Sequence, residues 1–206
     1  MNQKLLAFAS CALVVLLSGC ALTTDRIEIP YAQQQGVSQV AGAKDVTVKV
    51  QVSDLRQDKS KVSSKKNGYG MEMAPILAIE EVTVTVRRAI ELELRARGFQ
   101  LGSETATVQI AADLTRFYND HKSGFFAGDA IAELNMAVTV KSKRGETLFA
   151  RIVIAQGIEA NTQLASGDNA KLALSRSLQN GMKLLFEDQA FLTALVASSS
   201  AKVASN

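Results

Sequence analysis

The chain has 206 residues, a formal net charge of +3, and nearly equal numbers of basic and acidic side chains. This net charge is too small to indicate the strongly basic character of many nucleic-acid-binding proteins, so we expect no nucleic-acid partner. Two cysteines and one histidine are too few for a usual zinc site or for a disulfide-stabilised scaffold. We therefore expect side-chain packing to stabilise the fold, and we expect neither a metal ion nor a cofactor.

The N-terminus has the layout of a lipoprotein signal. Lys4 precedes an apolar stretch over residues 5–17, and the run Leu17-Ser18-Gly19-Cys20 places small residues before a cysteine. The alternatives are a transmembrane helix and an ordinary signal peptide cut at a different bond. Residues 5–17 fall short of the roughly 20 residues that span a bilayer, which argues against the helix. We predict that residues 1–19 are a signal peptide cleaved between Gly19 and Cys20. The nucleophilic thiolate of Cys20 then carries a diacylglycerol, and its amino group carries an acyl chain such as palmitate.

Ala21, not aspartate, follows the predicted lipidation site. Lipoproteins without aspartate at this position are usually sorted to the outer membrane, so we expect a lipid anchor on the periplasmic face of a Gram-negative outer membrane. Residues 20–43 contain clustered glutamines and no apolar period, which predicts a flexible tether. Residues 197–206 are rich in Ser and Ala, which predicts a frayed tail. We interpret residues 44–196 as a single globular α/β domain.

Within that domain, apolar residues recur with period two in some segments and with period near four in others, which is typical of mixed folds. A short turn through Lys143, Arg144 and Gly145 predicts an antiparallel hairpin between the last two strands. We predict a two-layer α+β fold with an approximately four-stranded mixed sheet and two main helices on one face. The expected order is strand-helix-strand-strand-strand-helix. The predicted strands are 46–52, 108–114, 132–140 and 147–160, and the predicted helices are 79–97 and the stretch from Asp168 to Leu185.

Residues 79–97 fit two periods, because alternating valines overlap a helical stripe of apolar residues. Their length without Gly or Pro exceeds a normal strand, and Gly98 is a suitable residue to end a helix, so we interpret the segment as helical. In the second helix, Asp168 is the expected N-cap. Gly181 lies on its apolar stripe, where a residue without a side chain lets the helix approach the sheet closely.

Several local features together resemble the YajG-like bacterial lipoproteins. They are the signal ending at Cys20, the Asp54-Leu55-Arg56 stretch after the first strand, the helix ending in Arg97-Gly98-Phe99, the long hairpin and the terminal amphipathic helix. The resemblance covers most of the mature chain. It implies an outer-membrane lipoprotein with a compact α/β domain, and it carries over no catalytic residues.

Residues able to support catalysis are sparse. His121 lies beside Asp120, but no Gly-x-Ser-x-Gly motif is present, and a histidine in this setting is usually structural or solvated. Carboxylates such as Asp54 and Asp58 are paired only in sequence. We therefore expect no enzyme. A cell-wall hydrolase using His121 and Asp120 is the least favoured function.

Two segments are candidates for contact with a partner. The first runs from Arg56 to Tyr69 and contains Lys59, Lys61 and Lys65; its alternative interpretation is a solvated loop. The second contains Phe125 and Phe126 between glycines; its alternative is that both rings belong to the core. These features predict a noncatalytic module that binds an envelope protein or peptidoglycan. A small-ligand or lipid-handling domain, with an apolar pocket between helices and sheet, is the alternative function.

Overall fold

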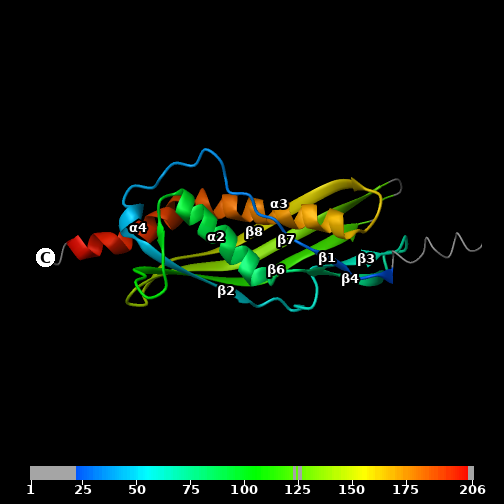
Figure 1. The fold of residues 1–206 in the computed structure, drawn as a ribbon, viewed down its shortest axis with the longest axis horizontal. Helices are drawn as coiled ribbons and strands as arrows, with labels where there is room; N and C mark the ends of the chain where they lie inside the picture. The colour runs from blue at the N-terminus through cyan, green and yellow to red at the C-terminus, as the bar shows by residue number, and fades with distance from the viewer. Residues whose placement is uncertain (1–21, 123, 125–126, 204–206) are drawn as a thin grey trace, which may run out of the picture.

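The structure, a computed structural model, describes residues 22–122, 124 and 127–203. In this part of the chain, a five-stranded sheet, a three-stranded sheet and three α-helices form an elongated α+β fold (Figure 1). Both sheets contain parallel and antiparallel pairs. The predicted mixed α+β class is confirmed, whereas the expected single sheet of about four strands is wrong in size and number.

The larger sheet has the strand order β5-β2-β6-β7-β8. Strand β2 lies parallel to β5 and β6, while β6, β7 and β8 form an antiparallel meander. The predicted hairpin between β7 and β8 is confirmed. Strands β6 and β7 run well beyond their predicted limits, whereas β8 nearly matches its own. The strands are β2 (Thr47–Asp54), β5 (Gln100–Leu101), β6 (Val108–Lys122), β7 (Gly128–Ser142) and β8 (Thr147–Thr162).

The smaller sheet, of order β1-β4-β3, consists of β1 (Asp25–Ile27), β4 (Glu72–Ala78) and β3 (Ser63–Lys66). Sequence periodicity does not predict it, because two of its strands have only three or four residues and β1 finds its partner far along the chain. The basic segment that we interpret as a loop therefore contains β3. This strand forms a hairpin with β4, and a bulge interrupts the pairing at Lys65 and Lys66.

Three helices cover one face of the larger sheet (Figure 1). Helix α2 (Val82–Ala96) confirms the helical interpretation of its segment, and it ends before Gly98, whose φ of 91° suits glycine. Helix α3 (Gly167–Phe186) begins after Ser166, whose side chain accepts a hydrogen bond from the Asn169 N–H; Ser166, not Asp168, is the N-cap. Helix α4 (Gln189–Val203) includes residues predicted to fray.

The core lies between the helices and the covered face of the sheet. Alternate residues of β6, β7 and β8 are buried there, as the period of two predicts.

Two glycines permit the close approach of α3 to the sheet. A Cβ at Gly157 of β8 would lie 2.2 Å from the Ala173 carbonyl oxygen, and one at Gly181 would lie 2.3 Å from Cδ2 of Leu134. The predicted close approach at Gly181 is confirmed.

Residues 25–42 pack on the domain, which corrects the interpretation of residues 20–43 as a tether. Ile27 and Ile29 are buried, and the segment then runs along α2 to the short 3-10 helix η2 (Ala43–Asp45). The Tyr31 hydroxyl donates to Oε1 of Glu93 at 2.6 Å. Because the side chains that pack on the domain are spaced irregularly along the segment, no helical or strand period in the sequence predicts the packing.

Candidate functional site

The basic segment begins with a buried arginine. Arg56 donates to Asp54 through Nε at 3.0 Å and through a terminal nitrogen at 2.9 Å, and it also reaches the carbonyl oxygens of Lys61 and Phe117. Although burial alone would raise the pKa of Asp54, the hydrogen bonds from Arg56 outweigh it and hold this pKa below its ordinary value. Arg56 therefore holds the start of the segment to β2 and β6 and is not available to a partner.

Three lysines of the segment are paired with carboxylates from other parts of the chain. Lys61 meets Glu72 at 2.5 Å, Lys65 meets Asp25 at 2.8 Å, and Lys66 meets Asp120 at 2.5 Å. The hydrogen bond to Glu72 raises the pKa of Lys61. Lys59 contributes its carbonyl oxygen to the Arg56 side chain. Of the predicted contact residues, Lys61 and Lys65 are thus neutralised by ion pairs, whereas Lys59 is exposed. The pairs of Lys65 and Lys66 hold the β3–β4 hairpin to β1 and β6.

His121 and Asp120 do not form a catalytic pair. His121 is buried on the covered face of β6, beside Asn119, while Asp120 lies on the opposite face and binds Lys66. Burial lowers the pKa of His121 to about 4, against the opposing effect of Asp120. The Nδ1 atom of His121 has no hydrogen-bond partner among the described residues. Neighbouring residues of a strand point to opposite faces, so the hydrolase hypothesis loses its acid–base pair.

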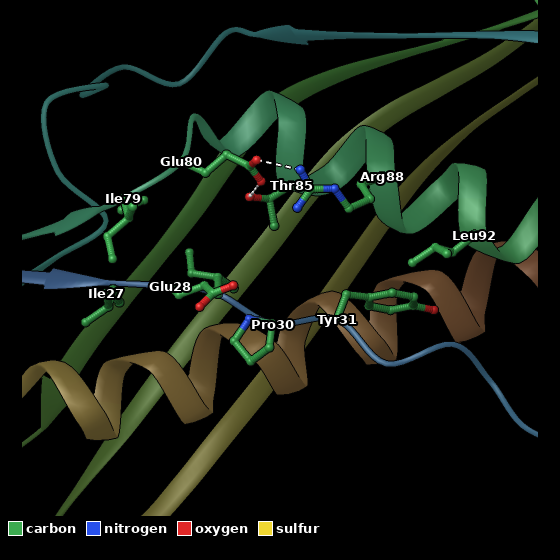
Figure 2. A pocket seen from close by; sticks show the side chains of 11 residues that line it. Ile27, Glu28, Pro30, Tyr31, Ile79, Glu80, Thr85, Arg88 and Leu92 are labelled. Atoms are coloured by element: carbon green, nitrogen blue, oxygen red, sulfur yellow. Dashed lines mark hydrogen bonds and ion pairs between the residues drawn. The ribbon is translucent and has the colours of Figure 1, made fainter.

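One cavity, shown in Figure 2, lies between residues 27–31, the end of β4 and helix α2. Its volume of about 340 Å³ is at the lower end of the range for small-molecule sites. Several of its polar groups are paired with each other. Arg88 binds Glu80 at 2.6 Å, and the Thr85 hydroxyl donates to the same carboxylate at 3.2 Å. The cavity is not the expected apolar pocket between helices and sheet, and it offers a ligand few free polar partners.

The open face of the larger sheet carries an apolar strip that sequence reasoning missed. Ile152, Ile154 and Ile158 of β8 are 68%, 63% and 47% exposed. In the register with β7, Ile152 lies opposite Ala137 and Ile158 opposite Ile131, so the strip has apolar neighbours on the next strand. The signal was available in the sequence: Ile152-Val153-Ile154 is apolar at consecutive positions, which a strand with one solvated face does not need.

Strand β8 is also an edge of the sheet, and only part of this edge is covered. Asn180 of α3 donates to the carbonyl oxygen of Gln156 at 2.7 Å, and Arg176 donates to that of Ile158. These contacts occupy the second half of the strand. Among the described residues, the first half, up to Ile154, has a sheet partner only in β7. An unpaired edge beside exposed isoleucines is suited to strand addition by another polypeptide.

The described parts of the chain contain neither a metal-binding cluster of side chains nor a helix that could span a membrane. No group of three or more His, Cys, Asp or Glu side chains gathers there in a way that could hold a metal ion. No helix there is both long enough and apolar enough to cross a bilayer. Gly19, Cys20, Phe125 and Phe126 lie outside the described residues, so their predicted roles remain predictions.

Comparisons with known proteins give the family. No curated protein matches the chain in a comparison of sequences. A Xanthomonas campestris protein of the DUF330 family has a similar structure, with a TM-score of 0.56, 13% identity, and coverage of 87% of this chain and 99% of that one. A minor lipoprotein from Acinetobacter baumannii is more distant, with a TM-score of 0.42, 8% identity, and coverage of 74% and 92%. A family model described as an uncharacterized lipoprotein matches residues 32–196. This match covers most of the chain, which therefore belongs to the YajG-like family of uncharacterized lipoproteins.

Proposed function

We propose that the chain is an outer-membrane lipoprotein, anchored through lipid on Cys20, that acts without catalysis by binding an envelope protein along β8. The exposed apolar strip of Ile152, Ile154 and Ile158 beside an unpaired strand edge carries the proposal. Exposed apolar groups of this kind gain free energy when a partner removes them from water. The backbone groups of the open edge can hydrogen-bond to an extended segment of the partner, and these bonds fix the register and direction of that segment along β8.

A protein is favoured over peptidoglycan because of the chemistry that each would need. Peptidoglycan presents sugar hydroxyls and carboxylates, for which free cations are the natural partners. Lys61, Lys65 and Lys66 already bind carboxylates of this chain. The isoleucine strip is instead complementary to a row of apolar side chains, and a protein partner can present such a row.

In-cell photo-crosslinking tests this function. A photoreactive residue at Ile154 should capture one distinct envelope protein, and the additional substitution Ile152→Ser should reduce that adduct at least fivefold. The matched control is the same probe at Gln51, which is exposed on β2 at the far side of the same sheet. Adducts from Ile154 that contain only peptidoglycan, lipid or a second copy of this chain, or that equal those from Gln51, would overturn the proposal.

A further inference from the structure

One end of the molecule gathers exposed apolar side chains from three separate segments. Tyr69 and Met71, in the β3–β4 turn, are 91% and 58% exposed, Leu22 before β1 is 63% exposed, and Leu164 before α3 is 74% exposed. We refer to these four residues as the apolar tip. Isolated exposed apolar residues are common, but four at one end, including a tyrosine almost fully in solvent, form a surface that needs an explanation.

Contacts among their neighbours place these segments at the same end. Lys65 Nζ lies 2.8 Å from the Asp25 carboxylate and 3.5 Å from the Thr23 hydroxyl, next to Leu22. The other oxygen of Asp25 accepts a hydrogen bond from the Gly167 N–H at 3.0 Å, which ties β1 to the start of α3. A hollow lined by Gly68 and Leu164 joins the β3–β4 turn to the segment before α3. Figure 1 shows β1, β3 and β4 at the opposite end from α4.

The turn that carries Tyr69 and Met71 has a defined backbone. The Asn67 side-chain oxygen accepts hydrogen bonds from the N–H groups of both residues, each at 3.0 Å. The Asn67 N–H in turn donates to the Met71 carbonyl oxygen at 3.0 Å. The two side chains are therefore presented outward by an ordered turn, which reduces the conformational entropy lost when they meet a partner.

The position of this end in the chain indicates what it meets. Leu22 is only two residues after Cys20, and two extended residues span at most about 7 Å. A lipid on Cys20, which belongs to the proposed function, would hold the apolar tip at the bilayer surface. Tyr is a residue that favours the membrane–water interface, where its ring is apolar and its hydroxyl remains hydrated.

We infer that the apolar tip inserts into the interfacial region of the membrane to which the chain is anchored. The insertion is apolar in character, because the neighbouring Lys65 and Lys66 are paired with Asp25 and Asp120 and do not present a free cationic patch. It supplements the lipid as a second point of attachment and restricts the tilt of the domain. The long strands β6 to β8 then extend away from the bilayer, which leaves the β8 edge open to a partner in the periplasm.

Lipid-borne quenching of a fluorophore tests the insertion. The full-length lipidated protein, with Tyr69→Cys labelled by the environment-sensitive dye NBD, is reconstituted in vesicles of phosphatidylethanolamine and phosphatidylglycerol that contain doxyl-labelled lipid. The matched control is Arg144→Cys, an exposed position in the β7–β8 turn at the other end. We expect at least twofold stronger quenching at Tyr69, unchanged at high salt. Equal quenching at both positions, with Tyr69 accessible to aqueous iodide, would overturn the inference.

A second labelled position guards against an effect of the dye itself. NBD at Leu164→Cys should also be quenched by doxyl lipid, and the added pair Tyr69→Ser and Met71→Ser should reduce this quenching at least twofold. If the pair causes no reduction, the two segments do not insert together.

Mass spectrometry of the Cys20 peptide and flotation of the vesicles report the anchor separately. If the protein floats with the vesicles but the label at position 69 is exposed to water, the insertion is refuted and the anchor is not. Protein without lipid on Cys20 refutes the anchor of the proposed function.

Discussion

At the scale of single residues, a buried ion pair joins the N-terminal segment to the helices. Glu93 is fully buried in α2 and accepts hydrogen bonds from Tyr31, from the Gln34 N–H at 2.8 Å and from Arg97 at 2.5 Å. Arg97 also lies over the ring of Phe186, 4.6 Å from its centroid. Burial and the hydrogen bond to Glu93 raise the pKa of Tyr31. One carboxylate therefore holds together residues 31–34, α2 and, through Arg97, the end of α3.

Removing this carboxylate should be costly. We expect Glu93→Ala to lower the free energy of unfolding by about 3–5 kcal/mol, because it leaves the Arg97 guanidinium buried without its partner. Urea denaturation measures the loss. The control is Glu91→Ala on the same helix, whose ion pairs with Arg87 and Arg95 are largely exposed; its effect should stay below about 1 kcal/mol. Equal losses in the two variants would contradict the role assigned to Glu93.

Protonation of His121 predicts how stability depends on pH. Burial lowers its pKa in the folded protein to about 4 from the ordinary value of 6.5. The folded state therefore binds fewer protons at this site than the unfolded state between pH 6.5 and 4, so the free energy of unfolding falls as the pH decreases through that range. His121→Gln, which cannot protonate, should show a smaller decrease between pH 7 and pH 4.5 in urea denaturation. An identical decrease in both proteins would show that other groups cause it.

At the scale of elements, the strands with a clear period were predictable from the sequence. Bulges and short strands with distant partners made the other elements unpredictable. The β7–β8 hairpin and α2 follow from local period and turn residues. Strand β6 was predicted to stop at Leu114, because a bulge between Leu114 and Arg116 shifts the alternation. Beyond the bulge, Phe117, Asn119 and His121 occupy the covered face. Two of these are polar, so their burial could not be inferred from hydropathy.

The packing of α3 on β8 depends on a residue without a side chain. A Cβ at Gly157 would lie 2.2 Å from both the Ala173 carbonyl oxygen and the Ser177 nitrogen, which are backbone atoms and cannot move aside cheaply. We expect Gly157→Ala to destabilise the fold by about 3 kcal/mol or more. Gly68→Ala, which has open space around it, should change stability by less than about 0.5 kcal/mol. A mild effect at Gly157, measured by thermal or urea unfolding, would mean that α3 can shift on the sheet.

At the scale of the whole molecule, the apolar tip and the β8 edge have separate proposed roles, the first in membrane contact and the second in partner binding. The tip lies at the end where the chain would join the anchor proposed on Cys20, and β8 extends from that end toward the β7–β8 turn (Figure 1). A lipid-anchored domain oriented in this way would present a strand edge to partners at a set distance from the bilayer. The packed segment 25–42, which replaces the expected tether, makes this arrangement more rigid than a flexible linker would.

The anchor and its address can be tested together. Cys20→Ala should release the protein from the membrane fraction, because the site of lipid attachment is lost. Ala21→Asp should keep the lipid and shift the protein from the outer-membrane to the inner-membrane fraction of a Gram-negative host. Sucrose-gradient fractionation with immunodetection measures both. Retention of the Cys20→Ala protein in the outer membrane, or no shift with Ala21→Asp, would refute lipid anchoring or the predicted sorting, respectively.

The sequence by itself determined the α+β class, the long hairpin and the helical character of residues 82–96, and it predicts the lipoprotein signal. These features depend on local chemistry: a short motif, a period of two or near four, and a turn or capping residue. Only the tertiary structure decided that Lys61, Lys65 and Lys66 are neutralised, that His121 and Asp120 face apart, and that Ile152 and Ile154 stay exposed beside an open edge. The lysine ion pairs and the position of β8 at the sheet edge depend on which distant segments meet, and such pairing leaves no periodic trace in a single sequence. The opposite orientations of His121 and Asp120 depend on β6 continuing past its bulge.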